Sequence, residues 1–186
     1  FANIADELIY NMTENGAYFL NSAQAEQLKS IALVEKDGKY SINKKWVGKD
    51  AGLFLKELGI NSDARLIICE TEESHPFVQV EMMMPVLAIV RVSGIKEAID
   101  LAVQAEHGNR HSAHIHSKNI DTLTKFARAV ETTIFVKNAP SYAGIGFNAE
   151  GWTTFTIAGP TGEGITSPRS FTRLRRCVLS DALYII

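Results

Sequence analysis

The chain has 186 residues, which is enough for one domain with a sizeable core. Its 46% hydrophobic and 22% charged residues are typical of a globular protein, and its net charge of −2 argues against a dedicated nucleic-acid-binding or membrane-surface protein. No apolar run approaches the ~20 residues of a membrane span, and residues 1–10 do not have the pattern of a signal peptide. Two cysteines far apart in the sequence favour a reducing compartment, so we expect a cytoplasmic protein.

Apolar residues at helical spacing predict helices over residues 2–13, 22–33, 50–58, 95–106 and 119–130. In the first helix, four apolar residues share one face and are expected to point inward, namely Ile4, Leu8, Ile9 and Met12. Ser22 is the expected N-cap of the second helix, and Gly59 is expected to end the third.

Short apolar segments predict strands over residues 65–70, 86–92, 112–116 and 133–136. The run 86–90 is continuous and rich in β-branched residues, so we expect it to be buried on both faces, with Pro85 marking its start. The residues Lys-Asp-Gly-Lys at 36–39 have the chemistry of a hairpin turn. Because strands and helices alternate, the sequence predicts an α/β fold, with a mainly parallel sheet and flanking helices.

Residues 138–168 are rich in glycine, which in a compact domain is more typical of a binding loop than of a linker. A strand is predicted within this segment at 152–157. Two further strand-like runs, 177–179 and 183–186, follow near the C-terminus. They would form a sheet edge that needs a partner strand.

One carboxylate, Glu81, stands just ahead of the strand that Pro85 opens. Ligands tend to be held at the sheet edges of α/β proteins. An ionised carboxylate has two acceptor oxygens, which can take two neighbouring hydroxyl donors such as those of a ribose. From the spacing alone, a solvated loop carboxylate is the alternative and the more common case.

Four histidines lie close together in the sequence, namely His107, His111, His114 and His116. If residues 112–116 form a strand, His114 and His116 point the same way, and two imidazoles on one face could bind a metal. The cluster contains no cysteine and only one carboxylate, Glu106. A third ligand is therefore not evident, and we predict no metal site.

The segment Glu81-Met82-Met83-Met84-Pro85-Val86-Leu87 resembles the aldehyde dehydrogenase motif that carries the nicotinamide-ribose glutamate. The variant is similar to that of the CoA-acylating branch found in ethanolamine and propanediol utilisation. This resemblance implies an aldehyde dehydrogenase catalytic domain with NAD as the cofactor. It also implies that Glu81 and Pro85 belong to the cofactor-binding site.

Two later segments carry the same resemblance. Residues 108–113, Gly-Asn-Arg-His-Ser-Ala, resemble the family's Gly-x-x-His-Ser/Thr element, which implies that His111 and Ser112 face the pocket where CoA approaches. An imidazole there could accept the thiol proton of CoA, and a packed structural histidine is the alternative. Residues 138–146 are similar to the family's Asn-x-Pro-Ser-x-x-Gly-x-Gly element, which implies a pocket lined by Asn138, Pro140 and Ser141.

The resemblance covers nearly the whole chain, so residues 1–186 are expected to be a catalytic-domain fragment, with 173–186 as C-terminal oligomerisation strands. The family's nucleophilic cysteine and its Rossmann portion should both lie upstream of Phe1. The implied reaction converts a short-chain aldehyde, CoA and NAD to acyl-CoA and NADH by covalent catalysis. The fragment alone is expected to be inactive.

The implied partners are the missing N-terminal Rossmann portion of the same enzyme, a small aldehyde substrate and further copies in a homo-dimer or tetramer, without nucleic acid or membrane. A place inside a bacterial microcompartment stays open beside a cytoplasmic one. Two other functions also stay open. The fragment could be an oligomerisation or scaffold module, or an unrelated acyl-transfer enzyme whose nucleophile is Cys177 or Cys69. Cations at Arg173, Arg175 and Arg176 would lower the pKa of the Cys177 thiol, but no Ser/Thr-Gly loop or helix start accompanies it, and a structural Cys177 is the favoured alternative.

Overall fold

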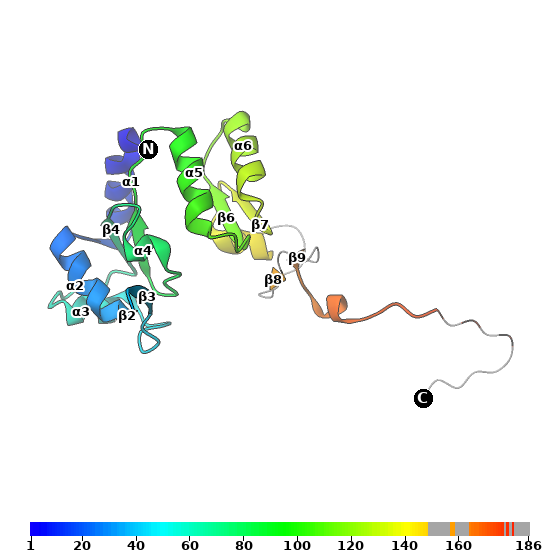
Figure 1. The fold of residues 1–186 in the computed structure, drawn as a ribbon, viewed down its shortest axis with the longest axis horizontal. Helices are drawn as coiled ribbons and strands as arrows, with labels where there is room; N and C mark the ends of the chain where they lie inside the picture. Colours follow the sequence, from blue (N-terminus) through cyan, green and yellow to red (C-terminus); the bar gives the residue numbers. More distant parts are fainter. Residues whose placement is uncertain (149–156, 159–163, 177, 179, 181–186) are drawn as a thin grey trace. The chain divides into compact units, whose positions relative to one another are not determined.

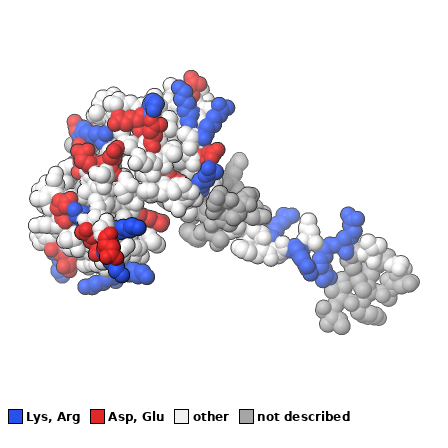
Figure 2. Space-filling view, viewed as in Figure 1, with Lys and Arg blue, Asp and Glu red and all other residues white. Residues whose placement is uncertain are grey.

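The computed structural model describes residues 1–148, 157–158, 164–176, 178 and 180. The chain divides into two compact units, Phe1–Ala105 and Glu106–Ile186, and each is described by itself (Figure 1). Helix α5 (Ile95–Glu106) spans the boundary between them. No helix in the described part of the chain is long and apolar enough to cross a bilayer. On the visible face of the first unit, acidic and basic side chains are interspersed (Figure 2).

The first unit is built on a parallel sheet in the order β1-β4-β5. Its strands are β1 (Ala17–Leu20), β4 (Leu66–Glu70) and β5 (Val86–Ile89). In register, Tyr18 of β1 lies opposite Ile67 of β4, which lies opposite Val86 of β5. The predicted parallel sheet and the start of β5 directly after Pro85 are confirmed.

Burial differs between the strands of this sheet. The middle strand β4 is buried as predicted, because Ile67, Ile68 and Cys69 are fully covered. The prediction that β5 is buried on both faces is wrong, since Leu87 is 45% exposed. In the described first unit only the face that carries Val86 and Ala88 packs on the core, and the opposite face at Leu87 is left partly open. Strand β1 was not predicted, because four apolar residues between two helices give too short a pattern.

Helices and a hairpin surround the sheet of the first unit. The helices are α1 (Ala2–Glu14), α2 (Ser22–Ala32), α3 (Ala51–Glu57) and α4 (Pro76–Gln79). The hairpin pairs β2 (Leu33–Lys36) with β3 (Lys39–Ile42), and positive φ angles at Asp37 and Gly38 confirm the predicted turn. The core centres on Leu28, Phe54, Leu55 and Ile67.

Two sequence predictions about these helices are corrected. The N-cap of α2 is Asn21, not Ser22, because Asn21 Oδ1 accepts the Gln24 N–H at 2.9 Å and forms a capping box with Gln24. In α1, Ile4 and Leu8 of the expected inward stripe are 47% and 49% exposed. The fully buried residue of that helix is Ala5, so the contact face of α1 is narrower than the apolar stripe.

The second unit is built on a parallel pair, β6 (Ser112–Ile115) and β7 (Ile134–Lys137), joined through α6 (Ile120–Val130). This pair and its helix confirm the predicted strand-helix-strand order. On one face, Phe126 of α6 contacts Phe135 of β7, with ring centroids 5.6 Å apart. Asn119 caps α6 by accepting the Thr122 N–H at 2.9 Å.

The 3-10 helix η1 (Ser141–Ile145) packs closely on β7. A Cβ added at Gly144 would stand 2.3 Å from Ile134 Cγ2, so only glycine permits this approach. The hairpin β8 (Ile157–Ala158) and β9 (Gly164–Ile165) and the 3-10 helix η2 (Pro168–Phe171) follow. Of the strand predicted at 152–157, all but the last residue lies outside the described residues, as do residues 177, 179 and 183–186 of the two C-terminal runs.

Candidate functional site

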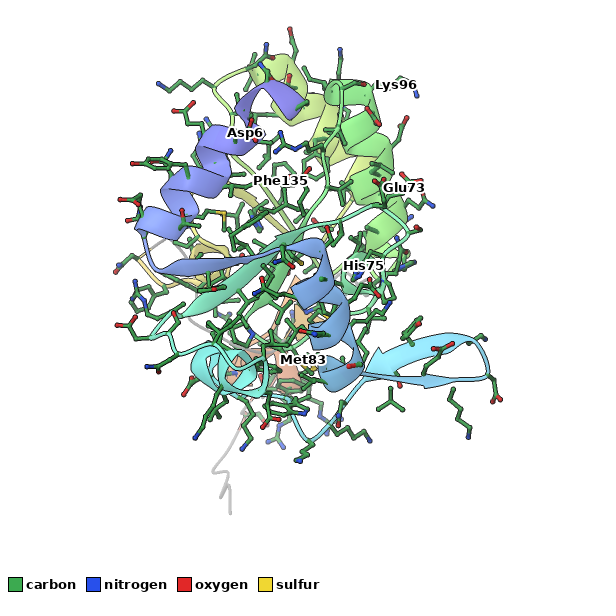
Figure 3. All side chains as sticks on the ribbon, turned by 90° about the vertical axis from the view of Figure 1, so that its left-hand side faces the viewer. Asp6, Glu73, His75, Met83, Lys96 and Phe135 are labelled. Carbon is green, nitrogen blue, oxygen red and sulfur yellow. The ribbon has the colours of Figure 1, made fainter. Side chains whose placement is uncertain are left out.

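Backbone hydrogen bonds anchor the loop that carries Glu81 between α4 and β5. The Pro85 carbonyl accepts the Ile67 N–H at 2.8 Å, which joins the end of the loop to the middle strand. The Met83 carbonyl accepts the Gly48 N–H at 3.3 Å, and Met83 itself has a left-handed φ of 50°. Figure 3 shows Met83 beside the cyan helix α3, which follows Gly48 in the chain. The loop is thus held at two points just after Glu81.

The Glu81 side chain is exposed, and its carboxylate has no hydrogen-bond partner among the described residues. Both oxygens are therefore available to a ligand. Glu81 lies at the amino end of β5, whereas α/β sheets usually hold ligands at the carboxyl ends of their strands. Glu81 therefore does not lie at the edge where such sheets usually hold ligands, and its place in a cofactor site stays a prediction.

The carboxyl ends of the three strands of the first unit border a cleft of about 1010 Å³. Residues that line it include Leu20, Asn21, Glu70, Thr71, His75 and Arg91. The Thr71 hydroxyl is buried and has no hydrogen-bond partner in the described part of the chain. Sequence reasoning missed this cleft because it missed β1, whose carboxyl end supplies one wall.

His75 lines this cleft, and its contacts indicate which ring nitrogen carries the hydrogen. Nδ1 accepts the Phe77 N–H at 3.1 Å at the start of α4, so the ring hydrogen belongs on Nε2. Nε2 lies 3.1 Å from Glu26 Oε1 and donates to it. The hydrogen bond from Lys29 is the main cause that keeps the pKa of Glu26 below its usual value, and the hydrogen bond from His75 lowers it further. Figure 3 shows His75 beside α2, which carries Glu26.

In the second unit, His111 and Ser112 form a pair at the start of β6. His111 Nδ1 lies 2.7 Å from Ser112 Oγ. The His111 N–H donates to Glu106 Oε1 at 3.0 Å, and its carbonyl accepts the Ile134 N–H at 3.0 Å. Both side chains are exposed. The backbone of His111 is therefore fixed while its imidazole remains accessible.

Asn138 follows the other end of the strand pair. Its side chain bridges Ser117, accepting the backbone N–H at 2.8 Å and donating to the carbonyl at 2.9 Å. Asn138 has a φ of 52°, which asparagine tolerates better than most residues. Pro140 then occupies the N-cap position of η1. This geometry places Pro140 and Ser141 beyond the carboxyl ends of β6 and β7.

The structure brings His114, and not His111, to Ser141. Ser141 Oγ lies 3.4 Å from His114 Nδ1. The rings of His114 and His116 are 6.1 Å apart, which confirms that both point the same way. His111 precedes Ser112, which pairs with Ile134 at the amino end of β7, and Ser141 comes after the carboxyl end of that strand. The alternation in β6 and its parallel register could have identified His114 as a pocket candidate.

No group of three potential ligands among the described histidines, cysteines and carboxylates could hold a metal ion. Cys69 is fully buried in β4, and burial raises the pKa of its thiol to about 11. A thiol with that pKa is protonated near neutral pH, which disfavours Cys69 as a nucleophile. Cys177 lies outside the described residues.

Comparison with known proteins assigns the class of this fold. The model of the aldehyde dehydrogenase family matches residues 23–154, and the chain therefore belongs to the aldehyde dehydrogenase family. This finding confirms the predicted α/β catalytic fold and the family resemblance.

Two curated relatives of the chain within this family are acylating aldehyde dehydrogenases. The chain is 50% identical over 188 residues to acetaldehyde dehydrogenase (acetylating) EutE of Salmonella typhimurium, covering 99% of this chain and 40% of the relative. It is 44% identical to propanal dehydrogenase (CoA-propanoylating) of the same organism, covering 98% of this chain and 39% of the relative. Thus the chain spans about 40% of the length of these curated relatives.

Solved structures give the same relationship. Propionaldehyde dehydrogenase of Rhodopseudomonas palustris, solved with bound CoA and an acylated cysteine, superimposes with a TM-score of 0.89 at 50% identity, covering 96% of this chain and 40% of that one. The propionaldehyde dehydrogenase of a Clostridium phytofermentans fucose-utilisation microcompartment gives a TM-score of 0.87 at 50% identity, covering 97% and 41%.

Proposed function

We propose that this chain is the C-terminal catalytic portion of a CoA-acylating aldehyde dehydrogenase, which converts a short-chain aldehyde, CoA and NAD to acyl-CoA and NADH. The observation that carries the proposal is 50% identity to an acetylating acetaldehyde dehydrogenase across 99% of this chain. The missing N-terminal portion supplies the Rossmann domain and the nucleophile. We further propose NAD over NADP, a homo-dimer or tetramer joined through residues 173–186, and a cytoplasmic or microcompartment location.

The residues of the first unit fit a nucleotide ribose. Glu81 has two exposed acceptor oxygens and no competing partner in the described chain, and its loop is anchored at Met83 and Pro85. The carboxylate would accept hydrogen bonds from two ribose hydroxyls without first breaking a bond of its own. Bound NAD accepts the hydride and CoA supplies the thiol that takes up the acyl group. Glu81 would orient the ribose of the cofactor and would not itself take part in the reaction.

The residues of the second unit fit a thiol and an acyl group. His111 presents an accessible imidazole beside the Ser112 hydroxyl, so it can hold a proton at Nε2 or release one. His114 on β6 and Ser141 at the start of η1 present a second imidazole and hydroxyl, next to Pro140. Thiolysis needs no water-activating carboxylate. Imidazoles, hydroxyls and the amide of Asn138 supply polar groups of this cluster, and the Glu106 carboxylate beside them accepts the His111 backbone N–H.

The nucleophile is proposed to precede Phe1. Cys69 does not fit the role, because its thiol is buried in the sheet and its pKa is raised to about 11. We expect a cysteine shortly before α1 to carry the acyl group. A Cys→Ala mutant and a His→Ala mutant of the Clostridium phytofermentans enzyme are among the similar solved structures.

CoA-dependent reduction of NAD tests the proposal. The 186-residue chain and a longer chain that carries the residues preceding Phe1 are compared with acetaldehyde and propanal, with NADP in a parallel series. We expect turnover by the longer chain alone, and faster turnover with NAD than with NADP. Turnover that is independent of CoA, or turnover by the 186-residue chain, would contradict the proposal. Solution mass with and without residues 173–186 tests the proposed oligomer.

A further inference from the structure

Arg91 joins three parts of the first unit. Its Nε and Nη2 donate to the two oxygens of Glu70, at 2.7 and 2.9 Å, in a bidentate pair. Nη2 also donates to Asp6 Oδ1 at 2.5 Å, and Nη1 reaches the Ala2 carbonyl at 3.4 Å. Glu70 ends β4, Arg91 follows β5, and Ala2 and Asp6 belong to the first turns of α1. Figure 3 shows Asp6 on that helix.

The start of α1 depends on this contact. Its N-cap, Phe1, provides no side-chain cap, and no acidic residue occupies the first turn. Among the described residues, a backbone hydrogen bond also holds this turn, in which the Ala2 N–H donates to the Val92 carbonyl at 2.9 Å. Arg91 and its neighbour Val92 therefore fix the first turn of α1 to the segment that follows β5.

The positive charge of Arg91 beside the start of α1 is offset by two carboxylates, Glu70 and Asp6. A cation beside a helix N-terminus is unfavourable because the helix dipole is positive there. Glu70 and Asp6 offset that cost, and their hydrogen bonds, Glu70 first, raise the pKa of Arg91. Of the three side chains, Asp6 is 87% exposed, whereas Arg91 and Glu70 are 31% and 37% exposed. The bidentate Arg91–Glu70 pair is thus the more protected half of the contact.

We propose that Arg91 is a positioning residue for the acyl-transfer reaction, which acts by holding the start of α1 against β4 and β5. The inference rests on the proposed function in one respect, because it needs the nucleophilic cysteine to lie a short way before Phe1. A cysteine there is carried by the segment that enters α1. Any tilt of the first turn moves that segment, and a displacement of ~1 Å can lower a rate about 100-fold.

The contact of Arg91 with Glu70, Asp6 and Ala2, called the clamp from here on, is tested first in the 186-residue chain by amide hydrogen exchange. Arg91→Met keeps most of the apolar stem and removes every donor. We expect exchange at the hydrogen-bonded amides of Ala2 and Ile4, and at those of residues 6–9 that bond back to the first turn, to rise about tenfold or more, and Arg91→Lys to restore part of the protection. Lys96→Met is the matched control, because it removes the exposed Lys96–Asp100 pair of α5, whose ends are 2.6 Å apart. The control should leave exchange in α1 unchanged.

Positioning is tested in the longer chain that carries the residues before Phe1. For Arg91→Met we expect kcat to fall about 10- to 100-fold while the KM for aldehyde changes little, and for Arg91→Lys to recover part of kcat. The rate of thiol alkylation against pH should change as well, because the environment of the cysteine changes. Lys96→Met should leave kcat, the KM for aldehyde and the pH dependence of thiol alkylation unchanged.

The outcomes separate the two claims. Raised exchange in α1 with unchanged kcat overturns positioning and leaves Arg91 a structural residue. Unchanged exchange overturns the clamp itself. If the unsubstituted longer chain fails to reduce NAD while exchange in α1 responds to Arg91→Met, the proposed function is contradicted, and the catalytic part of this inference falls with it.

Discussion

The two units hold their candidate residues in different ways. In the first unit, backbone hydrogen bonds fix the loop of Glu81, and the carboxylate itself has no partner in the described chain. In the second unit, the candidate side chains bond to neighbours, as Asn138 does to Ser117 and Ser141 to His114. A free carboxylate on a fixed loop can be changed with little effect on stability, whereas a bonded side chain contributes to its own scaffold.

The largest expected effect concerns the buried core of the first unit. Phe54 is fully buried and its ring lies 4.7 Å from Trp46, whereas its neighbour Leu53 is 46% exposed. We expect Phe54→Ala to lower the free energy of unfolding by about 3–5 kcal/mol, because it opens a cavity. Leu53→Ala is the control and should cost less than half as much in urea unfolding. Equal effects would contradict the assignment of the core.

Overpacking should destabilise the second unit by a smaller amount. A Cβ at Gly144 would stand 2.3 Å from Ile134 Cγ2 and 2.9 Å from Val136 Cγ2. We expect Gly144→Ala to cost about 1–3 kcal/mol and to raise amide exchange in η1 and β7. Gly94 has open space around its Cα, so Gly94→Ala should not reproduce the change in η1. If Gly144→Ala is neutral there, the close approach of η1 to β7 is refuted.

Asn138 combines two hydrogen bonds with a left-handed backbone. Asn138→Ala and Asn138→Gly both remove the bonds, but only glycine adopts a φ of 52° freely. We expect losses of about 1–2 kcal/mol for alanine and less for glycine in thermal unfolding. A larger loss for glycine than for alanine would show that the backbone conformation is not the constraint.

Glu81→Gln should leave stability almost unchanged, within about 0.5 kcal/mol, because the exposed side chain has no partner to lose among the described residues. In the longer chain, the same substitution weakens charge-assisted bonds to ribose, and we expect the KM for NAD to rise about 10-fold. Glu73→Gln changes an exposed carboxylate elsewhere on the first unit and is the control. Equal KM values for both variants would remove Glu81 from the cofactor site.

A pH-dependent signal concerns Cys69, whose folded pKa of about 11 lies above the ordinary thiol value. The native state then holds a proton that the unfolded state releases first, so its stabilising effect is present below pH 9 and is lost as the pH rises toward 11. We expect unfolding free energy to fall more steeply over that range in the unsubstituted chain than in Cys69→Ala. Alkylation of the native Cys69 at neutral pH should be slow, and fast alkylation would revive it as a nucleophile.

The sequence predicted what local patterns encode. Helices with strong apolar periodicity and the strand after Pro85 appear where expected, because residues within a few positions of one another decide them. The proximity of His114 to Ser141 could not be predicted in this way, since it depends on the register of two strands. The cleft at the carboxyl ends likewise depends on β1, whose four residues carry too little pattern.

The exposure of β5 has a similar explanation. Its apolar composition indicated burial on both faces, yet Leu87 is 45% exposed in this chain. The apolar composition of a strand indicates that it can pack against other apolar surfaces. Whether a given face is buried depends on whether another helix or strand lies over that face. That distinction matters for a chain that spans about 40% of its curated relatives.

The most direct test of the central claim is to locate the acyl group on the protein. The longer chain is incubated with propionyl-CoA, so that a cysteine thiolate takes the propionyl group and CoA thiol leaves, and the acylated peptide is identified by mass spectrometry. We predict propionyl on a cysteine that precedes Phe1, with Cys69 and Cys177 unmodified. Propionyl on Cys177 or Cys69 would contradict it, because the nucleophile would then belong to this chain.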